Sequence, residues 1–265
     1  MRGNSAVRKI TYGVCGSIVD FLIWYTALVG ASIGKSGSRG VYRAFQEADD
    51  FLAQVNHQTL ATAWHRLTKK RLVSCQKRQN LYSPQITEFG KKRLEETIPQ
   101  YHKNRPWDGK IYLITYDIPE TANLKRDQLR HFLKQIGAKL LQESTFLTPY
   151  NPRQLINQFI QKYKIPGTII VSDVGKDGGV GETNIQNLLV RLYGLEKLNE
   201  RYEKFIKHSQ EKEKPLQGLL FEYLSILKED PELPFELLAK GWLGDKAYIL
   251  YEKLKEIYTN SFAAA

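Results

Sequence analysis

The sequence has few of the residues that build disulfide scaffolds or metal centres. Its 265 residues include only two cysteines, Cys15 and Cys75, which fit neither a CxxC motif nor the Cys/His spacing of a zinc site. A disulfide-rich secreted fold is therefore excluded, and we expect a cytoplasmic protein without a structural metal or a cofactor. The segment from Gly30 to Ser36 also lacks the spacing of a phosphate-binding loop, because three residues separate its glycines instead of four.

Low-complexity tracts and regular repeats are absent as well. Hydrophobic residues make up 42% of the chain and aromatic residues 11%, a composition that excludes a disordered or collagen-like protein. A chain of 265 residues is longer than one compact core of ordinary size requires. We therefore expect a folded protein built from two or three separate units.

Positive charge is in excess, and the excess is confined to the first part of the chain. The formal net charge is +11. Residues 1–105 contain 17 Lys and Arg against 7 Asp and Glu, whereas the remaining residues contain 22 against 21. Basic side chains bind nucleic acid because they contact phosphates and release counterions. This asymmetry favours a nucleic-acid-binding head joined to nearly neutral domains, and a basic surface without a partner is the alternative.

The longest apolar run covers residues 10–34 and contains a single charged residue, Asp20. Its length and the preceding Arg8 and Lys9 are typical of a membrane-spanning helix or a signal peptide. A carboxylate in the middle of such a helix would be costly in hydrocarbon. We therefore favour a buried amphipathic helix of a soluble domain, and membrane contact through residues 10–34 is the alternative.

Residues 40–98 show the element order of a winged helix-turn-helix domain. A helical pattern at 41–52 leads through a turn into a second helix, and Asn56 is typical of the residue that caps such a helix. The second helix has one packed face, for which we expect Leu60, Trp64 and Leu67. Its opposite face is polar and is free to meet a partner.

A basic hairpin and a third helix complete this domain. Strands at 72–78 and 81–86, joined by a two-residue turn, predict the wing. Thr87 opens the third helix, for which we expect Phe89 and Leu94 to point inward. The exposed face of this helix is then basic and is formed by Lys91, Lys92 and Arg93.

The candidate DNA contacts lie on the second helix and the wing. In winged helices the second helix enters the major groove with its first residues nearest the bases. Gln58, Thr59 and Thr62 are therefore the candidate base readers, since glutamine pairs with adenine and threonine contacts a base or the thymine methyl. The candidate phosphate contacts are His65, Arg66, Lys69, Lys70, Lys77 and Arg78. The alternative is a winged helix that binds another protein.

The rest of the chain predicts two further domains. Residues 107–175 have the order of a ferredoxin-like βαββαβ domain, whose first strand ends at Asp117. Residues 184–260 show only helical periodicity and predict an all-helical domain. We therefore expect an α+β protein with domains at 1–98, 107–175 and 184–260.

Three segments carry a resemblance to a known family. The segment Tyr116-Asp117-Ile118-Pro119-Glu120, with the helix after it, resembles the ferredoxin-like domain shared by the small CRISPR adaptation nuclease and PaaX-type transcriptional repressors. The segments from Tyr193 to Tyr202 and from Glu229 to Gly244 are similar to the C-terminal domain of PaaX-type regulators. The match runs from about residue 40 onward, and its segments follow in the same order.

This resemblance implies a bacterial transcriptional repressor that binds double-stranded DNA as a homodimer at a pseudo-palindromic operator. It also implies a small-molecule effector, such as an acyl-CoA thioester, that releases DNA. The alternative implied by the nuclease relatives is metal-dependent cleavage, in which Asp117 from two protomers would hold Mg²⁺ and act as the catalytic carboxylate. We favour the regulator and expect no enzymatic activity.

Overall fold

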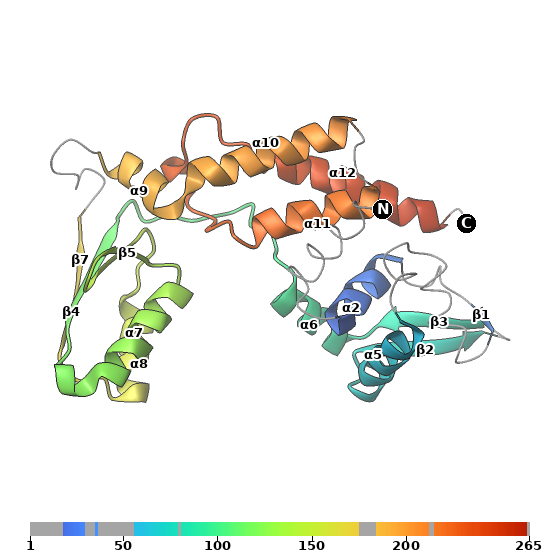
Figure 1. The fold of residues 1–265 in the computed structure, drawn as a ribbon, viewed down its shortest axis with the longest axis horizontal. Helices are drawn as coiled ribbons and strands as arrows, with labels where there is room; N and C mark the ends of the chain where they lie inside the picture. The colour runs from blue at the N-terminus through green and yellow to red at the C-terminus, as the bar shows by residue number, and fades with distance from the viewer. Residues whose placement is uncertain are drawn as a thin grey trace. The chain divides into compact units, whose positions relative to one another are not determined.

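The computed structural model describes residues 18–29, 35–36, 56–78, 81–174, 184–211 and 215–263. These residues form both helices and β-sheets, which confirms the α+β class (Figure 1). The chain divides into two compact units. Unit 1 consists of Met1–Tyr101, Glu200–Asp230 and Leu243–Ala265, and unit 2 consists of His102–Asn199 and Pro231–Trp242. The three-domain division at 1–98, 107–175 and 184–260 stays a prediction.

Unit 1 combines a head of winged-helix element order with C-terminal helices. Its described helices are α2 (Ile18–Val29), α5 (His57–Lys69), α6 (Glu88–Thr97), the larger part of α10 (Leu195–Glu211), α11 (Leu216–Leu227) and α12 (Gly244–Ala263). Its sheet has the order β1-β3-β2 and consists of β1 (Lys35–Ser36), β2 (Val73–Arg78) and β3 (Leu81–Ile86). The antiparallel pairing of β2 with β3 confirms the predicted hairpin. The helix expected at 41–52 and the turn at 79–80 lie outside the described residues.

Helix α2 comes from the apolar run and is buried by other helices of unit 1. Its residues 20–26 are buried, and the helix contacts α5, α6 and α12. The Trp24 ring lies 4.5 Å from the ring of Phe221 on α11. Among the described residues, no helix is both long and apolar enough to cross a membrane. The burial and contacts of α2 make the described part of the run a core helix of unit 1.

Local sequence explains where α5 begins and which face it buries. The Asn56 side chain accepts a hydrogen bond from the Gln58 backbone N–H at 2.8 Å, which confirms the predicted N-cap. Leu60, Ala63 and Leu67 are buried, whereas Trp64 is only half-buried. The packed face thus contains the predicted Leu60 and Leu67 together with Ala63, which was not predicted, and Trp64 lies at its edge. The small side chain of Ala63 lets neighbouring elements approach the helix closely.

Helix α6 packs closely against the connection between α5 and the wing through a glycine. Thr87 caps α6 by accepting a hydrogen bond from the Gly90 N–H at 3.1 Å. The Thr87 hydroxyl in turn donates to the Arg71 carbonyl at 2.6 Å. A Cβ atom at Gly90 would lie 2.1 Å from the carbonyl oxygen of Leu72, which no other residue type could accommodate without movement. This contact joins the third helix to the connection between α5 and the wing.

One side chain of α6 does not point where the sequence predicted. Phe89 is 67% exposed instead of facing inward, because the neighbouring Gly90 takes the buried position of the first turn. Arg93 is exposed as predicted, and its guanidinium also forms an ion pair with Asp20 of α2, whose buried carboxylate requires a partner. Lys91 and Lys92 are exposed as expected.

Unit 2 has the predicted βαββαβ order. Its elements are β4 (Tyr112–Asp117), η2 (Glu120–Ala122), α7 (Asn123–Gln135), β5 (Lys139–Gln142), β6 (Thr145–Thr148), α8 (Arg153–Tyr163) and β7 (Thr168–Asp173). The strand order is β5-β6-β4-β7, and all neighbouring strands are antiparallel. Helices α7 and α8 lie side by side along the sheet (Figure 1), and their Phe132 and Phe159 rings stack at 4.0 Å.

A second core of unit 2 joins the sheet to later parts of the chain. It contains residues of α9 (Ile185–Tyr193) and of the segment around η3 (Phe235–Leu237), packed against Ile111 and Leu147. The buried Arg105 guanidinium donates to the Leu233 carbonyl at 3.1 Å and lies 4.7 Å from the centre of the Phe235 ring. Arg105 thereby ties the linker before the sheet to the segment at 231–242.

Candidate nucleic-acid interface

The exposed face of α5 carries polar and basic side chains and no acidic one. The predicted contact residues whose side chains are described are all exposed: Gln58, Thr59, Thr62, His65, Arg66, Lys69 and Lys70. Lys77 and Arg78 belong to β2, but their side chains lie outside the described residues. One helix and its C-cap therefore bring seven of the nine predicted residues together.

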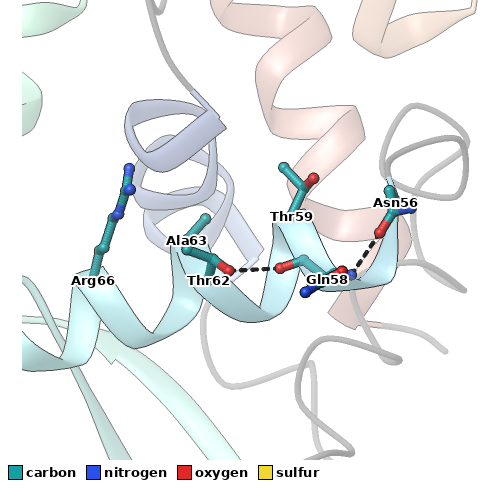
Figure 2. Close-up of a pocket in the computed structure, with 6 residues that line it drawn as sticks. All are labelled: Asn56, Gln58, Thr59, Thr62, Ala63 and Arg66. Atoms are coloured by element: carbon teal, nitrogen blue, oxygen red, sulfur yellow. Dashed lines mark hydrogen bonds between the residues drawn. The ribbon is translucent and has the colours of Figure 1, made fainter.

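The first turns of α5 border a hollow of about 470 Å³ (Figure 2). Its described lining residues are Asn56, Gln58, Thr59, Thr62, Ala63 and Arg66. The Thr62 hydroxyl donates to the Gln58 carbonyl at 2.8 Å, as the dashed line in Figure 2 shows. Its proton is thus engaged within the helix, and the methyl group and the oxygen lone pairs are what Thr62 can offer to a partner. A thymine methyl or a base amino group fits this chemistry.

Positive charge gathers at the other end of α5. Arg66 and Lys69 lie in its last turn, Lys70 forms its C-cap, and the exposed Arg71 follows. Arg71 was not among the predicted contacts, although the run Lys69-Lys70-Arg71 indicates it. Its backbone has a φ of 55°, in the left-handed region, and the hydrogen bond from Thr87 to its carbonyl holds this turn. Arg66 and Lys69 therefore lie at the end of α5, and Lys70 and Arg71 lie on the connection to the wing that the Thr87 hydrogen bond holds.

Asp117, the candidate catalytic and metal-binding residue, lies at the exposed end of β4. Its Cα pairs with that of Thr168 on β7. A Cβ atom at Gly167, whose φ is +91°, would lie 2.2 Å from the Asp117 carbonyl oxygen. Within the described residues, no group of three or more His, Cys, Asp or Glu side chains could hold a metal ion. The local geometry is that of a tight strand end.

Two family models match the chain. The PaaX protein central Cas2-like domain matches residues 104–184, and the PaaX-like protein C-terminal domain matches residues 193–264. Together these matches cover more than half of the chain. The chain belongs to the PaaX family. PaaX proteins are regulators and not enzymes, so the resemblance of the central domain to the CRISPR nuclease is structural and Asp117 is not assigned a catalytic role.

The fold of this PaaX-family chain is similar to that of the uncharacterized protein Rv0674 from Mycobacterium tuberculosis. The two share 14% sequence identity with a TM-score of 0.58, over 95% of this chain and 98% of the other. At this identity the likeness concerns the fold alone. None of the curated proteins compared with the chain matches it.

Proposed function

We propose that this PaaX-family regulator is a DNA-binding transcriptional repressor of the bacterial cytoplasm. The observation that supports the proposal is the exposed, acid-free face of α5. Gln58, Thr59 and Thr62 occupy its first turns, where a recognition helix comes closest to base edges. Arg66 and Lys69 follow in the last turn, where cations suit phosphates. Lys77 and Arg78 would extend the phosphate contacts to the wing.

A homodimer would carry two such helices. Two-fold symmetry would then match a pseudo-palindromic operator, with half-sites separated by about one helical turn or a multiple of it. Release of DNA by a small effector, for which the resemblance implies an acyl-CoA thioester, completes the proposed repressor cycle.

The experiment that tests the function is a selection of random duplex DNA on the purified protein, in Mg²⁺ at physiological salt. Enrichment of an intact inverted repeat is the expected result, and its sequence would be the operator. The affinity for this repeat should fall steeply with salt concentration, because each phosphate contact releases counterions. Failure to enrich any sequence, or a protein partner bound through the wing without salt dependence, would contradict the proposal.

Paired charge variants show whether α5 makes the contacts. We expect Arg66→Ala with Lys69→Ala to weaken operator binding by at least about tenfold and to lower the salt slope by about two. The matched control is Lys134→Ala with Lys162→Ala, which removes the same charge from exposed positions of α7 and α8 in unit 2. The control protein should bind the operator almost as tightly as the original. An equal loss of operator affinity in the α5 variant and the control variant would indicate a net-charge effect and would exclude α5 as the interface.

A further inference from the structure

Unit 1 contains a cavity of about 450 Å³ that shares no described lining residue with the hollow on α5. Its walls come from α2, from α6 and the residues that follow it, from Leu227 of α11, and from α12. Small-molecule pockets have volumes of roughly 300–1,000 Å³. The cavity is therefore large enough for a compact organic ligand.

The walls of this cavity are rich in aromatic rings. Trp24, Tyr101, Tyr248 and Tyr251 all line it. The rings of Tyr101 and Tyr248 stack with centres 4.3 Å apart and planes 14° apart. Trp24 and Tyr251 are buried side chains whose positions are set by the core of unit 1. Aromatic faces carry partial negative charge, so such walls attract flat apolar groups and cations.

The charged side chains of the lining add further negative charge. Two carboxylates, Glu95 and Glu252, and one ammonium, Lys255, belong to the described lining. The Lys255 Nζ lies 3.1 Å from a Glu252 carboxylate oxygen and 5.8 Å from the centre of the Tyr251 ring. A cation is thus already held in the lining by a carboxylate and a ring face. With Lys255 counted, the described lining still has one negative charge in excess.

A hydroxyl without a partner lies beside the aromatic wall. The Tyr223 hydroxyl is buried and makes no hydrogen bond to any described residue. Its ring stacks on Tyr251 at 4.4 Å. Burial raises the pKa of Tyr223, and the nearby Tyr101 and Tyr251 phenols raise it further. Buried hydroxyls in proteins are usually satisfied, so this group is an unused hydrogen-bonding group behind the Tyr251 ring, although Tyr223 is not among the described lining residues.

We propose that this cavity binds a small organic cation of the arylalkylamine class. The aromatic part would pack among Trp24, Tyr248 and Tyr251, and the ammonium group would lie near the carboxylates. The described lining offers nothing that favours the phosphates of an acyl-CoA thioester, because its one ammonium, Lys255, is already paired with Glu252. The lining thus selects for positive charge and aromaticity together.

Helix α2 gives this binding a route to the proposed DNA contacts, since α2 lines the cavity with Trp24 and also contacts α5. An effect of the ligand on DNA binding rests on the proposed function. Binding of the ligand itself does not rest on it, and it is measured on the protein without DNA. Failure of one proposal is therefore distinguishable from failure of the other.

The test is a calorimetric titration of the full chain with three probes. Tryptamine and indole-3-acetate share one ring system and carry opposite charges, and benzoyl-CoA represents the acyl-CoA thioesters. We expect tryptamine to bind at least about tenfold more tightly than either anion, the size of effect that a desolvated cation–ring contact supports. Tighter binding of indole-3-acetate or benzoyl-CoA, or no binding of tryptamine at millimolar concentration, would overturn the proposal.

Two variants assign the binding to the cavity. Glu252→Gln keeps the side-chain volume and removes one carboxylate. Tryptamine should therefore bind about three- to tenfold more weakly, and indole-3-acetate should bind more tightly. Tyr248→Ala removes one ring and should weaken tryptamine binding about tenfold. Glu256→Gln, an exposed carboxylate one turn further along α12 and outside the lining, is the matched control and should change nothing. Unfolding temperatures verify that each variant is folded, and unchanged tryptamine binding by folded Glu252→Gln would also refute the site.

Discussion

The Arg93 guanidinium of α6 binds the Asp20 carboxylate of α2 through two hydrogen bonds, from Nε to Oδ1 at 2.8 Å and from Nη2 to Oδ2 at 3.1 Å. The Asp20 side chain is 7% exposed and that of Arg93 is 48% exposed. The hydrogen bond and the charge of Asp20 raise the pKa of Arg93. The carboxylate in the middle of the apolar run is therefore a link between the first and third described helices of the head.

This asymmetry in exposure predicts unequal effects of removing either partner. Arg93→Ala removes the described ion-pair partner of a buried carboxylate and should lower the free energy of unfolding by about 2–4 kcal/mol. Asp20→Asn leaves a half-exposed guanidinium that water can solvate, and should cost about 1–2 kcal/mol. Urea unfolding of both variants measures the difference, with the exposed Lys92→Ala as control. A larger loss for Asp20→Asn than for Arg93→Ala would show that burial of the carboxylate is not the dominant cost.

Gly90 provides the second prediction, which concerns packing alone. Gly90→Ala would place a methyl group 2.1 Å from the Leu72 carbonyl oxygen and 2.7 Å from Cγ1 of Ile86. Because a backbone atom must move to relieve this overlap, we expect a loss of stability of about 1–3 kcal/mol despite the better helix propensity of alanine. Thermal unfolding would detect this loss of stability. The control is Glu96→Ala on the exposed side of α6, which should leave the midpoint temperature of unfolding almost unchanged. A stabilised Gly90→Ala protein would mean that α6 packs less closely against Leu72 and Ile86 than described.

The two ends of α5 should affect DNA recognition differently. Gln58→Ala should relax discrimination at one position of each half-site by about 1–3 kcal/mol, because a direct base contact is lost. Lys69→Ala should weaken binding to all sequences alike and reduce the salt slope by about one. Affinities for the selected operator and its single-base variants at several salt concentrations separate these effects. Uniform weakening by Gln58→Ala would place its side chain on the backbone instead of on a base.

Arg105 provides a prediction for unit 2. Its guanidinium donates to the carbonyls of His102 and Leu233, both at 3.1 Å, and only 2% of its side chain is exposed. Arg105→Leu should therefore lower the stability of unit 2 by about 2–4 kcal/mol, since it leaves carbonyl groups and the Glu232 carboxylate without this cation. Hydrogen exchange at 231–242 would report the loss locally, and Lys134→Ala is the exposed control. Unchanged protection of this segment would contradict the role of Arg105.

Most elements could be predicted because their signals are local. Asn56 caps α5 through a contact two residues away, and the wing follows from two strands around a short turn. The βαββαβ order of unit 2 was also predictable, because strand and helix periodicities alternate along the chain. The polar face of α5 needed no tertiary information, since helix geometry alone places Gln58, Thr62 and Lys69 away from the packed residues.

By itself, the sequence determined the helices, the hairpin, the basic face of α5 and the family resemblance, all of which depend on neighbours in the chain or on ordered motifs. Only the tertiary structure decided which distant groups meet. Asp20 and Arg93 are 73 residues apart, and no local rule pairs them. The exposure of Phe89, the close contact at Gly90 and the aromatic cavity between α2 and α12 likewise follow from long-range packing, which is set by how whole helix faces fit together.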